Sequence, residues 1–334
     1  MQLNFSFIIP VYNRPDEIDE LLQSLTKQTF TEPFEVVVVE DGSTISSKEV
    51  IGKYAHNLDI SYYEKPNSGP GDSRNYGMRK AKGNYFLILD SDCILPSQYL
   101  VEVKNALQKT DVDCFGGPDA AHESFTNVQK AINYVMTSFL TTGGIRGSEK
   151  SVDKFQPRSF NMGLSQKAFK ATQGFGNIHP GEDPDLTIRL WKRGFETQFI
   201  SKAYVYHKRR ISWKKFYQQV QKFGKCRPIL NSWHPETAKI TYWFPTAFVV
   251  GVLFAIVSLF FGFPIFIQLL GLYLAVLFID ATIKNKSILI GLQALIATFI
   301  QFFGYGIGFL VATFKIAVLH QKPQKAFPYL FFDN

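Results

Sequence analysis

Two aspartates one residue apart, Asp90 and Asp92, follow the apolar run Tyr85–Leu89. Side chains alternate along an extended chain, so both carboxylates point to the same side. Carboxylate oxygens bind hard divalent cations such as Mg²⁺ or Mn²⁺, and a bound cation lets them hold phosphate oxygens that they would otherwise repel. A lone Asp-x-Asp also occurs in solvated turns. Its place at the end of a buried run favours a site for a metal ion and a diphosphate, with Ser91 between the two aspartates.

A second acidic pair, Glu182-Asp183, lies between a glycine and a proline. A carboxylate held in place accepts a proton from an attacking hydroxyl and contributes about 10²–10⁴ in rate. Asp183 is the candidate for this role. It has another interpretation, because an Asp before Pro184 is typical of a helix N-cap with proline at the first helical position. The two roles are compatible, since a cap holds its carboxylate rigidly.

Glycines in the segment Asn67–Gly83 open a predicted helix whose first turns carry Arg74 and Asn75. A helix N-terminus with nearby cations is a natural anion site. The segment has neither the G-x-G-x-x-G pattern of dinucleotide-binding proteins nor a P-loop. Asp41 follows the valine-rich run Glu35–Val39, and it either forms a turn with the next residues or accepts hydrogen bonds from a base N–H.

The elements that must position these residues alternate along the first half of the chain. Continuous apolar strands between amphipathic helices predict a doubly wound, mostly parallel α/β sheet. Ligands of such sheets bind at the carboxyl ends of the strands, where Asn13-Arg14, Glu40-Asp41 and the aspartate pair meet. The predicted strands are Phe5–Val11, Glu35–Val39, Ile60–Tyr63 and Tyr85–Leu89, and the predicted helices cover about Ile18–Leu25, Ser47–Tyr54 and Gly71–Lys80.

The last third of the chain is apolar. Forty consecutive residues from Ile240 to Ile279 carry no formal charge, and neither does the run Ser287–Phe314. Since a spanning helix needs about 20 apolar residues, we expect membrane helices at about 240–262, 264–283 and 287–319. The positive-inside rule puts Lys284 and Lys286 on the cytoplasmic side. The third run is either one crossing or a re-entrant pair broken at the glycines of 304–308.

The net charge of +8 is concentrated before the apolar region, with nine Lys or Arg and no Asp or Glu between Lys202 and Arg227. This position favours anionic lipid headgroups over nucleic acid. Aromatic and aliphatic residues recur every three or four positions among these cations, which indicates a helix in the membrane interface. The chain opens without a signal-peptide pattern and has three unpatterned cysteines, so we expect the catalytic part in the cytoplasm.

Taken together, the motifs resemble the family 2 inverting glycosyltransferases of the GT-A fold over roughly Phe5–His207. Many members have Asp where this chain has Glu40. The resemblance implies a GT-A domain at 1–210, and the charge and apolar patterns then give a basic interfacial segment at 211–239 and a membrane domain at 240–334. The motifs are Pro10-Val-Tyr-Asn-Arg-Pro15, Glu40-Asp-Gly-Ser43, Ser73-Arg-Asn-Tyr-Gly77, Lys82-Gly83, Asp90-Ser-Asp92 and Gly181-Glu-Asp183.

The resemblance also implies roles for single residues. Asp183 is the expected general base, Asp92 the expected ligand of Mg²⁺ or Mn²⁺, and His207 either a further ligand or a hydrogen-bonded structural residue. The expected acceptor-side residues are Glu182, Trp213, Gln218 and Arg227. The expected donor-binding residues are Pro10, Tyr12, Asn13, Asp41, Arg74, Asn75, Asp90, Ser91, Asn161, Met162 and Gly163.

The expected reaction is transfer of a sugar from a UDP- or GDP-sugar to a polyprenyl-diphosphate-linked saccharide at the cytoplasmic membrane, in the synthesis of a cell-surface polysaccharide. The segment before the apolar region lacks the Q-x-x-R-W motif of processive synthases, which disfavours a polymerising channel. Transfer to polyprenyl phosphate itself, as in enzymes similar to dolichyl-phosphate-mannose synthase, stays open. So does a non-catalytic membrane scaffold that only binds nucleotide.

Overall fold

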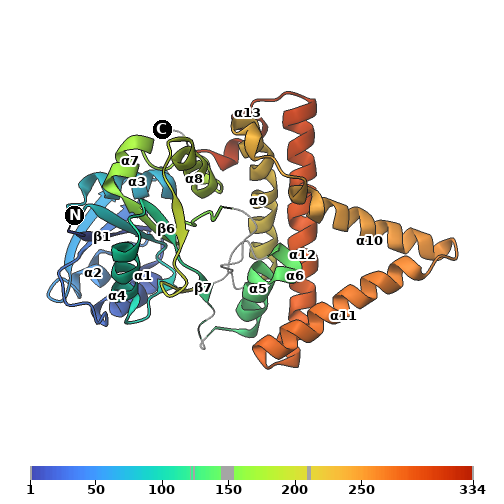
Figure 1. The fold of residues 1–334 in the computed structure, drawn as a ribbon, viewed down its shortest axis with the longest axis horizontal. Coiled ribbons are helices and arrows are strands. Elements are labelled where there is room, and N and C mark those ends of the chain that lie inside the picture. Colours follow the sequence, from blue (N-terminus) through green and yellow to red (C-terminus); the bar gives the residue numbers. More distant parts are fainter. Residues whose placement is uncertain (1, 121, 123–124, 144–153, 209–211, 333–334) are drawn as a thin grey trace. The chain divides into compact units, whose positions relative to one another are not determined.

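The computed structural model describes residues 2–120, 122, 125–143, 154–208 and 212–332, and these divide into two compact units (Figure 1). The first unit contains residues 1–122, 147–208 and 331–334, and the second contains 123–146 and 209–330. The chain therefore passes between the units several times. The segment 125–143, which the sequence placed with the catalytic domain, packs with the C-terminal helices.

The first unit is built on a mixed sheet with the strand order β3-β2-β1-β4-β8-β6-β9 among the described residues. The first four strands in this order are parallel, and β8 runs antiparallel to both β4 and β6. A smaller sheet has the order β5-β10-β7. The strands are β1 Phe5–Val11, β2 Glu35–Asp41, β3 Asp59–Lys65, β4 Tyr85–Leu89, β5 Cys93–Ile94, β6 Cys114–Gly116, β7 Asp119–Ala120, β8 Asn161–Ser165, β9 Thr197–Phe199 and β10 Val205–His207.

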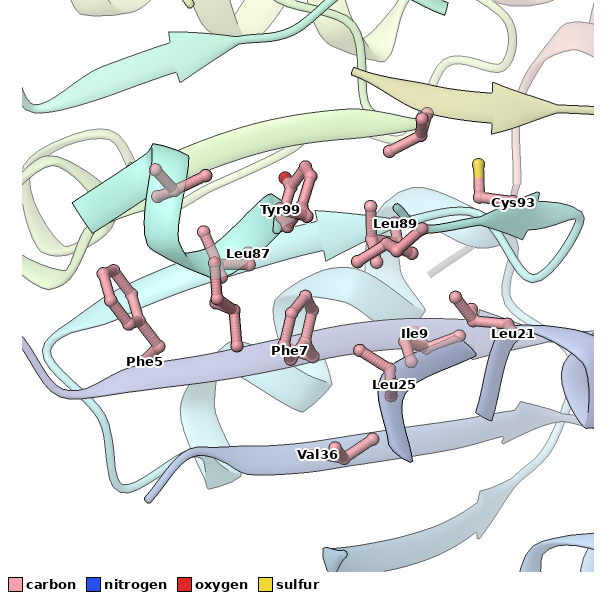
Figure 2. Packing of buried hydrophobic residues seen from close by; sticks show 14 of the residues in the cluster. Phe5, Phe7, Ile9, Leu21, Leu25, Val36, Leu87, Leu89, Cys93 and Tyr99 are labelled. Carbon is pink, nitrogen blue, oxygen red and sulfur yellow. The ribbon is translucent and has the colours of Figure 1, made fainter. Parts of the chain in front are cut away.

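Both faces of the large sheet are covered, because alternate residues of its strands point to opposite sides. Phe7 and Ile9 pack with Leu21 of α1 on one face (Figure 2), while Ile8 packs with Leu186 of α8 on the other. All seven residues of β2 are buried, as expected for a central parallel strand. The helices of this unit are α1 Pro15–Thr26, α2 Lys48–Gly52, α3 Pro70–Lys80, α4 Tyr99–Lys109, α7 Gln166–Thr172 and α8 Glu182–Lys192.

The second unit is helical, and three of its helical segments are long and apolar enough to cross a membrane: Ile240–Phe260, Ile265–Asn285 and Ile288–Val318. In Figure 1, α10 and α11 diverge from the turn that joins them, and α12 forms the third side of the triangle. The described elements are α5 Asn127–Thr137, α6 Phe139–Thr142, α9 Trp213–Trp233, η1 Pro235–Thr237, η2 Ile240–Trp243, α10 Phe244–Phe260, α11 Ile265–Asn285, α12 Ile288–Thr313, η3 Phe314–Val318, α13 Pro323–Ala326 and η4 Pro328–Leu330.

The glycines of α12 do not break it into a re-entrant pair, since the helix continues through them. They provide close packing instead. A Cβ atom on Gly304 would lie 2.6 Å from Val220 of α9, and one on Gly308 would lie 2.5 Å from the Gln221 carbonyl oxygen. On another face, a Cβ on Gly306 would lie 2.7 Å from the Pro245 carbonyl oxygen. Small residues four apart let helix backbones approach closely, so this run is a packing surface.

Candidate active site

Arg74, in the second turn of α3, joins the two acidic motifs. Its Nη2 lies 2.6 Å from Oδ1 of Asp90, and its Nη1 lies 3.1 Å from Oε1 of Glu182. The guanidinium is almost fully buried and lies over the Phe175 ring. Buried charges are retained when they are paired, and the planar fork of arginine suits two carboxylates at once. Arg74 therefore fixes the loop after β4 and the start of α8 at one place.

The Glu182-Asp183 pair begins α8, but not in the way the sequence suggested. Gly181 is the N-cap, with φ of +125°, and Asp183 is the second helical residue, so the predicted N-cap role of Asp183 is wrong. A glycine takes the cap because a side chain is strained at this φ. Asp183 still lies in the first turn, where the helix dipole favours a negative charge.

The two neighbouring carboxyls have their pKa values moved in opposite directions. Burial alone would raise the pKa of Glu182, but the His179 ring, 2.8 Å from Oε1, and the Arg74 guanidinium lower it. Burial raises the pKa of Asp183, and the charge of Glu182 raises it further. Oδ1 of Asp183 is buried and has no hydrogen-bond partner among the described residues. A carboxylate with a raised pKa and a vacant acceptor oxygen is suited to take up a proton.

The site's candidate metal ligands are Asp92 and His207. Nε2 of His207 lies 3.2 Å from Oδ1 of Asp92, and its Nδ1 lies 3.7 Å from Oδ2 of Asp119. One ligand atom each from Asp92, Cys93 and His207 lies within 4.8 Å of the others. Asp119 is therefore a charged neighbour of the ring, at a separation longer than a hydrogen bond.

This donor set fits a hard divalent cation in part. A carboxylate oxygen and an imidazole nitrogen are acceptable to Mn²⁺, whereas Mg²⁺ prefers oxygen. The buried Cys93 thiol donates a hydrogen bond to the Phe160 carbonyl oxygen, 3.4 Å away, and is not an oxygen ligand. Asp92 and His207 are therefore the residues that would hold such an ion. Arg14, which lies 3.2 Å from the other Asp92 oxygen, adds a positive charge at the same place.

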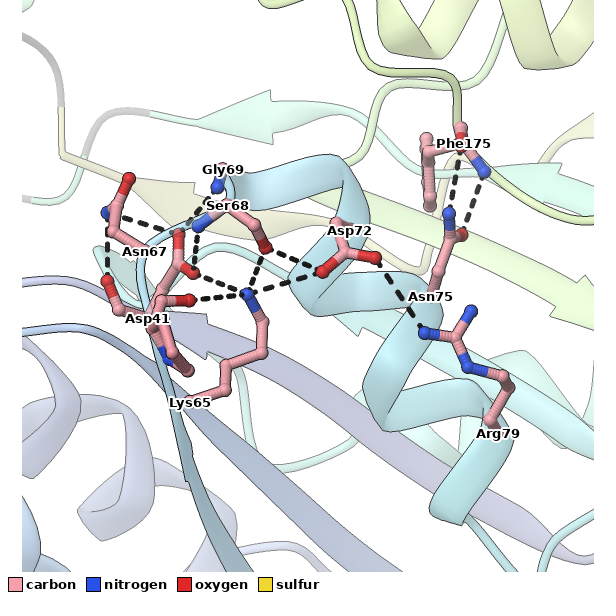
Figure 3. Close-up of polar contacts among 10 residues, drawn as sticks. Asp41, Lys65, Asn67, Ser68, Gly69, Asp72, Asn75, Arg79 and Phe175 are labelled. Atoms are coloured by element: carbon pink, nitrogen blue, oxygen red, sulfur yellow. Dashed lines mark hydrogen bonds and ion pairs between the residues drawn. The ribbon is translucent and has the colours of Figure 1, made fainter. Parts of the chain in front are cut away.

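Asp41 lies at the end of β2, and its carboxylate is used inside the protein (Figure 3). Oδ1 accepts from Lys65 Nζ at 2.6 Å and from the Ser68 N–H at 2.9 Å, and Oδ2 accepts from the Gly69 N–H at 3.0 Å. These contacts hold the loop that enters α3. The expected contact of Asp41 with a base stays a prediction. The contacts that the structure shows are structural, because they hold the loop in place.

Other residues at this edge of the sheet also tie loops together. Oδ1 of Asn13 accepts from the N–H groups of Thr44 and Ile45, at 2.8 and 2.9 Å. Oε2 of Glu40 accepts from the Ser47 N–H at 2.8 Å. Asn75 of α3 donates to the Phe175 carbonyl at 2.8 Å and accepts from its N–H at 2.8 Å (Figure 3). These side chains shape the carboxyl edge of the sheet, with Pro10 and the exposed Tyr12 beside them.

The predicted sugar-pocket segment starts at this edge and then leaves it. Asn161 pairs with Leu89, the residue before Asp90, but its side chain is fully buried between the Tyr99 hydroxyl at 2.7 Å and the Ala203 carbonyl at 2.8 Å. Met162 packs in the core, and Gly163 lies against the Phe115 ring. Ser91 is buried in the turn. The structure therefore brings Asp90, Asp92, Arg74, Glu182, Asp183 and His207 to the edge, and it buries Met162 and Gly163 away from it.

The predicted acceptor residues other than Glu182 belong to α9 in the second unit. Trp213 packs on the apolar cluster around Phe216, Gln218 is exposed, and the Arg227 guanidinium lies 4.3 Å from the centre of the Tyr242 ring. Their role on the acceptor side stays a prediction. The sequence reading missed His179, whose only signal is its spacing of three residues before Glu182.

Comparison with known proteins adds the family. Residues 6–170 match the model described as Glycosyl transferase family 2. Over 93 residues the chain is 44% identical to the poly(ribitol-phosphate) beta-N-acetylglucosaminyltransferase TarS of Staphylococcus aureus (strain Mu50 / ATCC 700699). This alignment covers 27% of this chain and 16% of TarS. Over 139 residues it is 33% identical to the glycosyltransferase AglE of Haloferax volcanii. That alignment covers 37% of this chain and 45% of AglE. The matched regions span less than half of either relative.

A solved structure extends the likeness to most of the chain. The mannosyltransferase PcManGT from Pyrobaculum calidifontis, in complex with GDP-Man and Mn²⁺, superposes with a TM-score of 0.60 over 91% of this chain and 88% of that chain, at 16% identity. At this identity the likeness concerns the fold. The predicted GT-A-type α/β domain with C-terminal apolar helices is confirmed.

Proposed function

The chain carries a glycosyltransferase family 2 domain, and from this premise we propose that it transfers a sugar, with inversion, from a nucleotide diphosphate sugar to a lipid-linked acceptor. One observation carries the proposal. Arg74 binds Asp90 at 2.6 Å and Glu182 at 3.1 Å, so the Asp-Ser-Asp motif and the Glu-Asp motif form a single site although Glu182 comes 92 positions after Asp90 in sequence.

Asp183 is the proposed general base. Inversion requires that the acceptor hydroxyl attack the anomeric carbon while it loses its proton, and the raised pKa of Asp183 favours that uptake. Arg74 holds the start of α8 against the loop after β4 and adds positive charge where the diphosphate departs. Asp92 and His207 would hold Mg²⁺ or Mn²⁺, which supplies further positive charge to the leaving diphosphate when bound.

The donor is proposed to be a UDP- or GDP-sugar. PcManGT, which has the same fold, was solved with GDP-Man and Mn²⁺. TarS is named as an N-acetylglucosaminyltransferase acting on poly(ribitol phosphate), which makes a polysaccharide pathway a reasonable context. Asp41, Asn13, Pro10, Tyr12 and Asn161 line or support the edge where this donor would bind.

The acceptor is proposed to be a polyprenyl-diphosphate-linked saccharide at the cytoplasmic face of the membrane. The three apolar helical segments would contact the lipid tail and the bilayer. The basic segment before them, including Lys222, Lys225 and Arg227, would contact anionic headgroups and the acceptor's diphosphate. Transfer to polyprenyl phosphate itself is the second candidate, and the product separates the two: mild acid releases a monosaccharide in that case and a longer saccharide otherwise.

The test is a panel of UDP- and GDP-sugars with the full chain in lipid, with Mg²⁺ or Mn²⁺ and an extract of polyprenyl-linked acceptors. We expect one donor to release its nucleoside diphosphate together with a lipid-linked product. Asp92→Ala should lower this release about a thousandfold, since a metal ion contributes several kcal/mol. The exposed Asp59→Ala is the matched control and should keep full activity. Equal activity of Asp92→Ala and the control would exclude the mechanism.

A further inference from the structure

Two residues far from the active-site motifs in sequence are fastened to the loop that precedes α8. Phe331 forms an antiparallel bridge with Ile178. The N–H of Phe332 donates to the Asn177 carbonyl oxygen at 3.1 Å, and Asn177 Nδ2 lies 3.4 Å from the Phe332 carbonyl oxygen. Phe331–Phe332 is therefore joined to residues 177–178 by an isolated antiparallel β-bridge and the hydrogen bonds beside it. All of these residues belong to the first unit.

The Phe332 ring fills the space over the start of α3. A Cβ atom on Gly69, the N-cap of α3, would lie 2.3 Å from Cδ2 of this ring. Gly69 has φ of +90°, a conformation that favours glycine. The absence of a side chain at this position also lets the Phe332 ring approach closely. On another side the ring pairs with His179, with 6.4 Å between the ring centres. Phe332 thus touches the entry of α3 and the loop 177–182 together.

The loop between α7 and α8 is fastened to α3 at its two ends by other groups. At its beginning, Asn75 exchanges two hydrogen bonds with the backbone of Phe175, both of 2.8 Å. At its end, Glu182 binds Arg74. Its middle, Asn177–His179, is the part that Phe331–Phe332 holds. His179 is in this middle part, and its Nδ1 lies 2.8 Å from Glu182.

We propose that Phe332 is a positioning residue for the transfer reaction: by holding Asn177–His179 against the start of α3, it sets the place of His179, Glu182 and Asp183. Phe332 does not act on the substrate. It acts through the loop, and the proposal rests on the proposed function, in which Asp183 is the base. Leu330, the residue before Phe331, belongs to the second unit, so the chain runs directly from that unit into the Phe331–Phe332 pair.

The test compares Phe332→Ala and Phe332→Leu in the full chain reconstituted in lipid. Truncation to alanine removes the ring contacts with Gly69 and His179, while leucine keeps much of the apolar volume. We expect Phe332→Ala to lower kcat about tenfold or more, because small misplacements of a catalytic group are costly. The KM for the donor should stay unchanged, and Phe332→Leu should recover most of kcat. Phe139→Ala, at an exposed aromatic residue of the second unit, is the control and should match the wild type.

A second readout does not need activity. Hydrogen exchange of the peptide that covers residues 175–182 should become faster in Phe332→Ala, with the global melting temperature retained. Unchanged exchange would show that Phe332 does not hold this loop, and this result does not depend on any measured activity. A failure of the wild type to turn over any nucleotide sugar would instead contradict the proposed function. A kcat equal to that of the wild type, or a parallel loss of kcat, donor binding and melting temperature that leucine does not recover, would overturn the positioning role.

Discussion

Two groups of acidic residues lie at the carboxyl edge of the same sheet, and they differ in what their oxygens contact. The nucleotide-side group, Glu40 and Asp41, accepts hydrogen bonds from backbone N–H groups and from Lys65. The second group, Asp90, Glu182 and Asp183, is gathered around the buried Arg74, and one Asp183 oxygen has no partner among the described residues. The first group holds loops in place, whereas the second leaves an acceptor for chemistry.

This difference teaches that a carboxylate at the end of a parallel strand is not by itself a catalytic signal. Backbone N–H groups satisfy a structural carboxylate and keep it charged. A reacting carboxylate needs burial, a like charge nearby and an open oxygen, which together raise its pKa and leave it a proton to accept. Asp183 has the charge of Glu182 beside it and one oxygen without a hydrogen-bond partner among the described residues, whereas both oxygens of Asp41 accept hydrogen bonds.

Replacing Arg74 tests this comparison most directly. Lysine carries one ammonium group and does not reach Asp90 and Glu182 with two separate N–H donors. We expect Arg74→Lys to lower kcat about ten- to a hundredfold, since the two acidic motifs lose their common anchor. Steady-state transfer at saturating donor is the measurement. Arg79→Lys, at an exposed arginine of the same helix, is the matched control. An Arg74→Lys variant as active as this control would show that the two motifs do not depend on Arg74.

A replacement at Asp41 sharpens the contrast in the other direction. Asp41→Asn removes the charge that pairs with Lys65 and places an amide NH₂ among N–H donors. Breaking a buried pair of this kind costs about 3 kcal/mol or more. We expect a lower melting temperature with most of kcat retained by the folded protein. Asp72→Asn, which changes a more exposed carboxylate beside the same lysine, should have a smaller effect on melting. Unchanged stability with a raised KM for the donor would make Asp41 a base contact instead of a structural residue.

The smallest expected effect is in the pH dependence of kcat. Asp183 accepts a proton only when it is deprotonated, and burial together with Glu182 raises its pKa. The acidic limb of kcat should therefore lie above the ordinary aspartate pKa of about 3.9. Because Glu182→Gln removes the neighbouring negative charge, the limb should move to lower pH in that variant. A shift to higher pH would contradict the electrostatic origin of the raised pKa.

The parallel half of the sheet is predictable from the sequence. The strands Phe5–Val11 and Tyr85–Leu89 have the predicted bounds, and the helix predicted at Gly71–Lys80 begins one residue earlier. Their apolar runs and glycine punctuation are local signals. The antiparallel strand β8 and its pairing with β4 carry no such signal, because register depends on partners far away in sequence.

The second unit shows a similar limit. Hydropathy predicts its three apolar segments, but it does not say which helices pack on one another. Helix α5 has an ordinary amphipathic pattern, and only the structure places Ile132 and Val135 in the cluster that contains α12 residues. The glycines at 304–308 suggested a break because glycine disfavours helices in water. They are close-packing positions, since a helix packed on its neighbours tolerates them.

Within the candidate site, motif spacing singled out Asp90, Asp92, Glu182 and Asp183, because each follows or opens a recognisable element, and their roles stay predictions. Motifs do not reveal what a side chain touches. The N-cap of α8 is Gly181 and not the predicted Asp183. The structure also places His179, Asp119 and Phe332 around the site, through contacts that no sequence motif indicates.

The central claim is that Asp183 removes the proton of the acceptor. Its most direct test is the kcat of Asp183→Asn in the full chain, measured at saturating donor beside the exposed Glu196→Gln control, with donor affinity measured separately. The account predicts that kcat falls by about 10²–10⁴ while donor affinity and melting temperature are retained. A kcat close to that of the control would contradict it and would assign the base to another residue.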